Sequence, residues 1–261
     1  MSAPVAGPTP GTHWEGEPVE CWREAWGVPL VEAWASIGST NDRALELAAA
    51  GAGPFTVVVA DEQTRGRGRR GASWHSPSGS GLWMSMVLPP RPAPAWLPLL
   101  VGLAVAEAIE GATGAVGVGI KWPNDLVLGA GKVGGILCES AGGAAVAGVG
   151  INVRAPREGF PEGIRTTATA LDVEGAKSLS ISRLAGMIID GVEQRLDVDA
   201  ASLDLATLRR LAARDVLAGR RIRTEEAGEG TARGIGPEGA LLLERPDGSR
   251  VNVSSGSVRV V

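Results

Sequence analysis

Residues 61–74 read Asp-Glu-Gln-Thr-Arg-Gly-Arg-Gly-Arg-Arg-Gly-Ala-Ser-Trp and place four arginines and three glycines between two apolar runs. The runs, residues 55–60 and 82–88, have the length and composition of buried strands. We therefore expect a loop that connects two strands of one sheet. Its glycines allow positive φ and close approach to a ligand, and guanidinium groups match carboxylate or phosphate oxygens in pairs. The loop predicts an anion-binding site.

Two other interpretations of this loop are a solvated Arg/Gly turn and an RNA-binding segment. Its four cations repel one another, so we expect it to be disordered until an anionic ligand neutralises them. The whole chain has a net charge of −4 and a pI of about 5.4, so its basic charge is local. An acidic chain does not favour nucleic acid as a partner, and we expect none.

The overall composition indicates a protein of the reducing cytoplasm. The 261 residues suffice for one or two domains with a sizeable core. Cys21 and Cys138 are far apart and lack the spacing of a zinc or redox motif. The first residues carry no positively charged signal, and Pro98 and Glu107 interrupt the longest apolar stretch, residues 96–109. We expect no membrane association.

The chain contains 22 arginines but only 3 lysines, with 4 asparagines and 2 glutamines. Lys121 and Lys132 nevertheless lie within twelve residues of each other beside Asn124, and Gln63 stands at the start of the arginine loop. An ammonium group is compact, whereas a guanidinium group is planar and larger. A lysine retained in an arginine-rich chain therefore indicates a small or exacting site.

Polar residues precede or follow several predicted elements. Ser39, Thr40 and Asn41 stand before a helix expected over residues 42–51, where they either cap the helix or bind a carbonyl or anion. Other helices are expected over residues 97–109, 182–196 and 203–216. Three short strands are expected within residues 119–152, with Lys121 and Asn152 at strand ends. Glycines at 134, 135, 148 and 150 would let a flat ligand lie against the backbone.

The composition also suggests domain boundaries. Residues 1–35 show no sustained helical period and lack the two helices of a DNA-binding head, so we treat them as an N-terminal extension. Residues 36–217 form the expected catalytic domain. Residues 218–261 consist of short strands separated by Gly and Asp-Gly turns, which predicts a small SH3-like β-barrel.

Five motifs, taken together, resemble those of biotin protein ligases. They are Ser39-Thr40-Asn41, Gln63 with Gly66-Arg-Gly-Arg-Arg-Gly71 and Trp74, Lys121-Trp-Pro-Asn-Asp125, Lys132 with Gly134-Gly-Ile-Leu137, and Gly148-Val-Gly-Ile-Asn152. The resemblance covers about residues 36–261 and implies an α/β (α+β) catalytic domain with a mixed sheet, the class II synthetase-like biotin/lipoate ligase fold, plus the SH3-like domain. Arg65 departs from the family, which usually has a small residue there, and the stretch after residue 165 matches only loosely.

The resemblance also implies a two-step reaction. A biotin carboxylate attacks the α-phosphorus of ATP, and a lysine of a biotin carboxyl carrier domain then attacks the biotinyl-5′-AMP. Two anions must meet, and each like-charge pair at 4 Å costs about 4 kcal/mol at an effective dielectric of 20. Lys121 and Arg69 are the expected catalytic cations. Mg²⁺ is expected with ATP, and Asp125 is the one candidate to reach it, since protein ligands alone form no metal site.

The remaining site residues follow from the same resemblance. Biotin is expected to contact Ser39, Thr40, Asn41, Gln63, Arg67, Gly68, Arg69, Lys121 and Gly135. ATP and the adenylate are expected to contact Gly66, Arg67, Arg69, Arg70, Trp74, Lys121, Asn124, Lys132 and Asn152, with Trp74 stacked on adenine. Trp83, Trp122 and Cys138 are expected to pack in the core. The nearest rival, a lipoate or octanoate ligase, would share the fold but lack the polar groups for the biotin ring.

Overall fold

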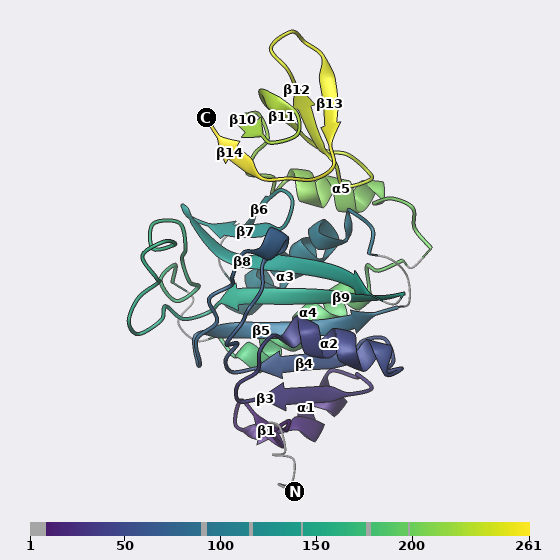
Figure 1. Ribbon diagram of the computed structural model, residues 1–261, viewed down its shortest axis with the longest axis vertical. Helices are drawn as coiled ribbons and strands as arrows, with labels where there is room; N and C mark the ends of the chain where they lie inside the picture. Colours follow the sequence, from purple (N-terminus) through teal and green to yellow (C-terminus); the bar gives the residue numbers. More distant parts are fainter. Residues whose placement is uncertain (1–8, 90–92, 115–116, 142, 176–178, 198) are drawn as a thin grey trace, which may run out of the picture.

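A computed structural model describes residues 9–89, 93–114, 117–141, 143–175, 179–197 and 199–261 of the chain. Its central feature is a seven-stranded sheet, with a smaller C-terminal sheet at one end (Figure 1). The strand order is β3-β4-β5-β9-β8-β7-β6; β3 and β4 are parallel and every other pair is antiparallel. The expected mixed sheet is confirmed. The strands are β3 (Val31–Trp34), β4 (Val57–Ala60), β5 (Gly81–Leu88), β6 (Gly119–Lys121), β7 (Asp125–Leu128), β8 (Gly131–Ala141) and β9 (Ala144–Asn152).

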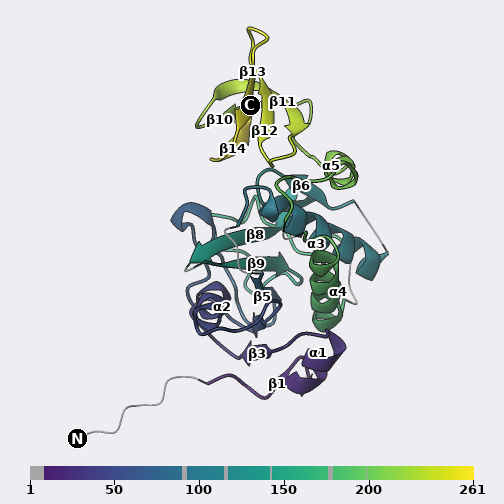
Figure 2. The same cartoon turned by 90° about the vertical axis from the view of Figure 1, so that its right-hand side faces the viewer.

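Helices cover both faces of this sheet, which explains why its central strands are apolar on both sides. Helices α3 (Leu97–Thr113) and α4 (Ile181–Glu193) lie on one face and α2 (Thr40–Ala49) on the other (Figure 2). In β4, Val57 and Val59 belong to the larger core under α3 and α4, while Val58 and Ala60 belong to the smaller core under α2. Burial of alternate residues in two cores fixes the strand register.

The N-terminal region forms short elements before the first strand of the main sheet. The structure has a two-stranded ribbon of β1 (His13–Trp14) and β2 (Glu17–Pro18), a seven-residue helix α1 (Val19–Ala25), and then β3. Because β3 pairs with β4 in parallel, the division placed after residue 35 cuts between β3 and its partner. The first eight residues lie outside the described ranges. Trp14, Trp22 and Trp26 bring this segment together, with ring centroids 5.8–6.4 Å apart, an apolar signal that helical periodicity alone does not detect.

The segment before Asn152 forms four strands instead of three, because residues 122–124 turn the chain between β6 and β7, with a cis Trp122–Pro123 bond. The C-terminal sheet is all antiparallel, in the order β13-β12-β11-β10-β14. Its strands are β10 (Arg221–Thr224), β11 (Gly228–Ile235), β12 (Leu241–Glu244), β13 (Arg250–Val253) and β14 (Val258–Val260), preceded by α5 (Leu205–Ala212). Among the described residues, no helix combines the length and hydropathy needed to cross a membrane.

The two sheets are joined at the turn between β11 and β12. Trp122 is buried and its Nε1 donates to the carbonyl of Gly239 at 2.8 Å. A Cβ atom on Gly239 would lie 2.6 Å from Cα of Trp96 in the catalytic part, so this close approach requires glycine. The C-terminal sheet therefore rests directly beside the motif that contains Lys121.

Candidate functional site

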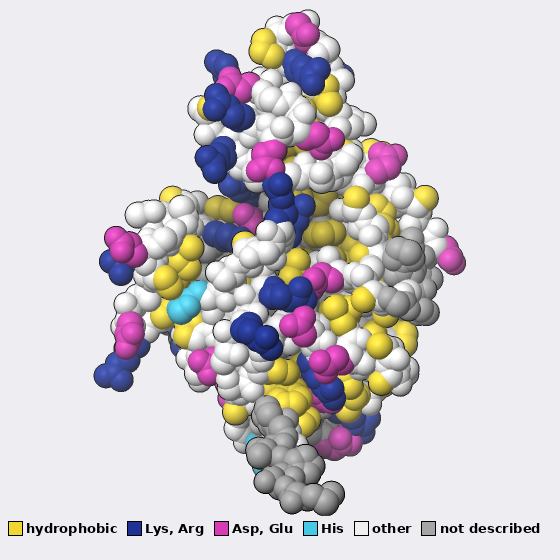
Figure 3. Space-filling model, viewed as in Figure 1, with side chains coloured by type: hydrophobic (Ala, Val, Ile, Leu, Met, Phe, Trp, Pro, Cys, Tyr) yellow, Lys and Arg dark blue, Asp and Glu magenta, His cyan; other side chains and the backbone are white. Residues whose placement is uncertain are grey.

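One cavity of about 300 Å³ gathers most of the expected site residues. It lies between the start of α2, the arginine loop, the central strands and the C-terminal sheet, and lysine and arginine side chains surround the hollow between the two sheets in Figure 3. Fourteen of the expected residues line it: Ser39, Thr40, Asn41, Gln63, Arg67, Gly68, Arg69, Arg70, Trp74, Lys121, Asn124, Asp125, Lys132 and Gly135. Gly66 and Asn152 do not.

The floor of the cavity follows from the sheet register. Ser85, Gly148 and Leu137 form one row across β5, β9 and β8, and Trp83, Gly150 and Gly135 form the next. A Cβ on Gly148 would lie 2.2 Å from Oδ1 of Asn41, and one on Gly150 would lie 2.6 Å from Nε1 of Trp74. Flat groups do lie against these glycines. In this structure they belong to the protein itself: the amide of Asn41 lies against Gly148 and the indole of Trp74 against Gly150.

Neutral hydrogen bonds fix one end of the cavity. Gln63 Oε1 accepts from the backbone N–H of Thr40 at 2.9 Å and from its hydroxyl at 3.1 Å, and Gln63 Nε2 donates to Ser76 Oγ at 2.9 Å. The hydroxyl of Ser85, fully buried, lies 2.8 Å from Oγ1 of Thr40. Ser39 is buried at the N-cap of α2, where its side chain makes no capping hydrogen bond. Thr40, Gln63, Ser76 and Ser85 therefore hold one another in place.

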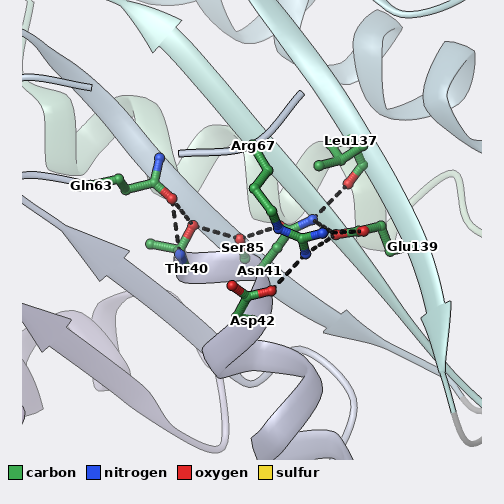
Figure 4. A network of polar contacts seen from close by, with 8 residues as sticks. All are labelled: Thr40, Asn41, Asp42, Gln63, Arg67, Ser85, Leu137 and Glu139. Carbon is green, nitrogen blue, oxygen red and sulfur yellow. Dashed lines mark hydrogen bonds and ion pairs between the residues drawn. The ribbon is translucent and has the colours of Figure 1, made fainter. Parts of the chain in front are cut away.

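Asn41 extends this network toward β8 (Figure 4). Its Nδ2 donates to the carbonyl of Leu137 at 3.2 Å and to Oε2 of Glu139 at 2.8 Å, and Ser85 donates to its Oδ1 at 2.5 Å. Both amide protons therefore have acceptors, and the network fixes which way the amide points.

The arginine loop lies folded over the cavity, because residues outside it supply acidic partners. Arg67 forms two hydrogen bonds with Glu139, at 2.8 and 2.6 Å, and its Nη2 also lies 2.7 Å from Asp42. Arg70 pairs with Glu225 of the C-terminal domain and has a left-handed backbone, with φ of 58°. The sequence analysis counted only the charges of the loop itself and did not include these carboxylates.

The other end of the cavity holds cations in a different setting. Arg69 Nη1 donates to Oδ1 of Asn124 at 3.3 Å, and burial lowers the pKa of its guanidinium. Asn124 is fixed in turn by Nδ2 donating to the carbonyl of Ile136 at 2.9 Å. Lys132 pairs with Asp125 at 2.6 Å. The side chain of the half-buried Lys121 forms no ion pair or hydrogen bond with any residue in the described ranges, so its charge is not neutralised by the protein there.

Trp74 separates this cavity from a second one of about 120 Å³. Its ring packs edge to face on Trp83, with centroids 6.4 Å apart, and Lys132 Nζ lies 5.1 Å from its ring centroid. Asn152 lines the second cavity and donates from Nδ2 to the carbonyl of Thr169 at 3.0 Å. The second cavity is lined by Ser73, Trp74, His75, Lys132, Asn152, Phe160, Ile164, Thr167 and Ala168.

Gly66 lies under the loop. A Cβ there would come within 2.5 Å of the carbonyl of Trp74, so glycine lets the two ends of the loop close on each other. Arg65 lies outside the cavity, against Gly38. Trp83 and Trp122 are buried, and Cys138 is partly buried against the core, where burial raises the pKa of its thiol. The expected packing role of Trp83 and Cys138 is confirmed, whereas Trp122 is buried and also lines the main cavity.

The sequence analysis missed residues 256–258 of the C-terminal domain, which line the main cavity. It also missed Ser85, Glu139 and Glu225, which contact residues of the cavity wall from outside it. Ser85 is the one hydroxyl in an otherwise apolar eight-residue strand, and that exception was a usable signal. Glu139 and Glu225 could have been sought as counter-charges for the loop. Of the described residues that line the main cavity, Asp125 alone carries a carboxylate. No group of three or more His, Cys, Asp or Glu side chains in the described part of the chain is arranged to hold a metal ion.

Comparison with known families gives two matches in different parts of the chain. Residues 34–155 match the Biotin/lipoate A/B protein ligase family, and residues 218–260 match the Biotin protein ligase C terminal domain. A Biotin–[acetyl-CoA-carboxylase] ligase of Mycobacterium tuberculosis is 36% identical over 250 residues, which is 91% of this chain and 89% of the relative.

Solved structures agree with the family matches. A biotin protein ligase from Aquifex aeolicus in complex with biotin and ATP superposes with a TM-score of 0.78, at 28% identity, over 89% of this chain and 100% of the other. One from Leishmania major in complex with biotinyl-5-AMP has a TM-score of 0.60 at 26% identity, over 87% and 99% of the two chains.

Proposed function

The chain belongs to the biotin protein ligase family, and from this premise we propose which of its residues perform each step of the family's reaction. Biotin and ATP form biotinyl-5′-AMP, and the biotinyl group then passes to the carboxyl carrier. The cavity of about 300 Å³ is where we place the first step.

The observation that carries this assignment is the division of the cavity into a neutral and a cationic end. Biotin has the same division, with an uncharged ureido ring that offers N–H and C=O groups and a carboxylate at the end of its chain. The buried Ser39 and Thr40 and the partly buried Gln63 suit the ring, because hydroxyl and amide groups both donate and accept. The carboxylate then points to Lys121 and Arg69.

These two cations lower the barrier to the meeting of two anions. Lys121 has no carboxylate partner among the described residues, so its charge is available to the biotin carboxylate and the α-phosphate. Arg69, oriented by Asn124, donates to the oxygens that gain charge as the carboxylate attacks phosphorus. Each charge-assisted hydrogen bond contributes roughly 1.5–3 kcal/mol. Pyrophosphate leaves, and the anhydride stays under the loop.

The nucleotide is assigned to Trp74 and the second cavity. Trp74 offers a ring for stacking on adenine, and Lys132 and Asn152 line the same space as Phe160 and Ile164. Mg²⁺ would arrive bound to the phosphates of ATP. Asp125 is the wall carboxylate able to approach it, although Lys132 already pairs with that carboxylate.

The second step needs no nucleophile from this protein. The lysine of a biotin carboxyl carrier domain attacks the carbonyl of the mixed anhydride, and AMP leaves. Cys138 is a poor alternative, because its raised thiol pKa keeps it protonated. We place the reaction in the cytoplasm, where two unpaired cysteines stay reduced, and we propose no nucleic-acid partner.

A lipoate or octanoate ligase would carry out the same adenylation on an apolar acyl chain. The polar set of Thr40, Asn41, Gln63 and Ser85 argues against it, since burying an apolar chain there would leave polar groups facing it. Calorimetry with biotin and with lipoate separates the two, and tighter binding of lipoate would refute the assignment.

The direct experiment incubates the purified chain with biotin, labelled Mg-ATP and a biotin carboxyl carrier domain. The wild type should release pyrophosphate, retain labelled adenylate and label the carrier. The Arg69→Ala variant should release adenylate into solution roughly tenfold faster, because it lacks one charge-assisted contact. A wild-type chain that forms no pyrophosphate would show the proposal to be wrong.

A further inference from the structure

Glu139 is the one acidic side chain that contacts both the start of α2 and the arginine loop within the described residues. It stands on β8, and one side of its carboxylate faces Asn41 while both oxygens face Arg67 (Figure 4). Its side chain is only 25% exposed, compared with 37% for Arg67. Neither the resemblance nor the assignments above give it a role.

The hydrogen bonds between Arg67 and Glu139 depend on the position of the arginine loop. Arg67 and Glu139 are 72 residues apart in sequence, so their two parallel hydrogen bonds exist only when the loop lies on the sheet. Such a paired arrangement fixes direction as well as distance, which a single contact does not. Asp42 touches the same guanidinium through one oxygen and is 49% exposed, so it is the weaker of the two anchors.

The hydrogen bond from Asn41 to Glu139 helps to fix the orientation of the Asn41 amide at the neutral end of the cavity. Glu139 Oε2 and the Leu137 carbonyl take both amide protons of Asn41, and this leaves Oδ1 facing Ser85. Without the carboxylate, the amide loses the acceptor that distinguishes its nitrogen from its oxygen on the β8 side. A rotated amide would present different groups to a ring bound above it.

We propose that Glu139 is a positioning residue that couples the neutral end of the cavity to closure of the arginine loop. It acts through Asn41 on one side and through Arg67 on the other, and touches neither substrate. The loop therefore holds the adenylate best when Asn41 is correctly oriented. This inference rests on the proposed function and adds the residue that connects its two halves.

The two contacts can be removed separately. In Glu139→Gln the amide oxygen still accepts from Asn41, but the charge opposite Arg67 is lost. We expect biotin affinity by calorimetry to change by less than about threefold, while adenylate release becomes roughly tenfold faster, the loss expected for one charge-assisted contact. Glu139→Ala removes both contacts, so both quantities should worsen. Glu46→Gln, which removes an exposed partner of Arg43 on the far part of α2, is the matched control.

If Glu139 had only a structural role, its substitution would change thermal stability but would not affect adenylate release more than biotin affinity. The decisive measurement is a double-mutant cycle in adenylate release, in which Glu139→Gln should add little once Arg67 is already Ala. Additive effects, or a release rate in Glu139→Gln equal to that of Glu46→Gln, would overturn the inference while leaving the wild-type reaction intact. Failure of the proposed function would instead appear as absence of pyrophosphate release in the wild type. If Glu139→Ala does not fold, Glu139→Gln carries the test.

Discussion

The two ends of the main cavity are built in opposite ways. At the neutral end, Thr40, Asn41, Gln63 and Ser85 use their polar groups on one another. At the cationic end, Lys121 has no partner among the described residues, and Arg69 has only a 3.3 Å contact with a neutral amide. The polar groups of the first end are thus held by the protein, whereas Lys121 and Arg69 at the second end keep their charge for a ligand.

This difference matches what each end has to recognise. A neutral ring is selected by shape and by hydrogen bonds whose directions are already fixed, which lowers the entropy cost of binding. An anion that changes its bonding during the reaction needs charge that is not already neutralised. Changes at the neutral end should therefore alter biotin binding, and changes at the cationic end should alter the rate of adenylation.

The largest expected effect is that of Lys121→Ala, which removes a cavity cation whose side chain has no partner among the described residues. Adenylate formation should slow by roughly 10²–10³-fold, the usual loss when one preorganised charged contact to a transition state is removed. Pyrophosphate release under saturating biotin and ATP measures it. Biotin affinity in the absence of ATP should fall far less. A variant that loses biotin binding but adenylates at the normal rate would erase the distinction between the two ends.

Gly148→Ala tests the neutral end. The new methyl would lie 2.2 Å from Oδ1 of Asn41, so the amide or the strand must shift. We expect biotin affinity to fall by roughly 10–10²-fold, in line with overpacking of a filled site. Calorimetry measures it, with Gly163→Ala as a control where a Cβ meets no atom within 4 Å. Normal affinity in Gly148→Ala would mean that this end is not preorganised.

Gly150→Ala, two residues further along the same face of β9, tests the nucleotide side of the cavity. Its methyl would lie 2.6 Å from Nε1 of Trp74 and should displace the indole. The KM for ATP should rise by about tenfold, less than a backbone clash would give, because a side chain can move. Steady-state pyrophosphate release at varied ATP provides the value. If Gly148→Ala and Gly150→Ala changed biotin affinity and the KM for ATP to the same extent, the division of the cavity into two ends would be contradicted.

The smallest expected effect is that of Glu225→Gln, which removes the exposed partner of Arg70 on the outside of the loop. Turnover should change by less than about threefold, as for other exposed pairs. The hydrogen bond from Arg70 lowers the pKa of Glu225 in the folded protein. Its contribution is therefore present at neutral pH and lost as pH falls through that lowered pKa. The melting temperatures of wild type and variant should converge at acidic pH. A difference that grows as the pH falls would contradict the expected pH dependence of stability.

Much of the fold was accessible from the sequence, because local patterns determined it. The apolar runs around the loop gave β4 and β5, and the Asp-Gly turns and short strands gave the C-terminal antiparallel sheet. The N-terminal residues were harder, since α1 has only seven residues and contacts among Trp14, Trp22 and Trp26 hold the segment together. Such contacts have no sequence period.

The site divides in the same way. Motifs predicted fourteen of the residues on the cavity wall, and most of these stand near the end of an element or in the loop, whereas Gly135 lies within β8. Ser85 and Glu139 escaped because their roles depend on sheet register, which places Ser85 opposite Gly148 and Glu139 opposite Val146. The acidic partners of the loop were missed for a related reason, since Asp42 lies on α2, Glu139 on β8 and Glu225 in the turn between β10 and β11.

The bond from the indole of Trp122 to the carbonyl of Gly239 has a consequence for how the chain can be shortened. Cutting the chain before residue 218 would leave that indole N–H without its acceptor and uncover the wall beside Lys121, at a cost of about 1–3 kcal/mol for the lost bond alone. The C-terminal sheet thus supports the wall of the cavity beside Lys121. A chain without this sheet is a poor starting point for a minimal labelling enzyme. Both sheets should melt together on heating, as a single calorimetric peak.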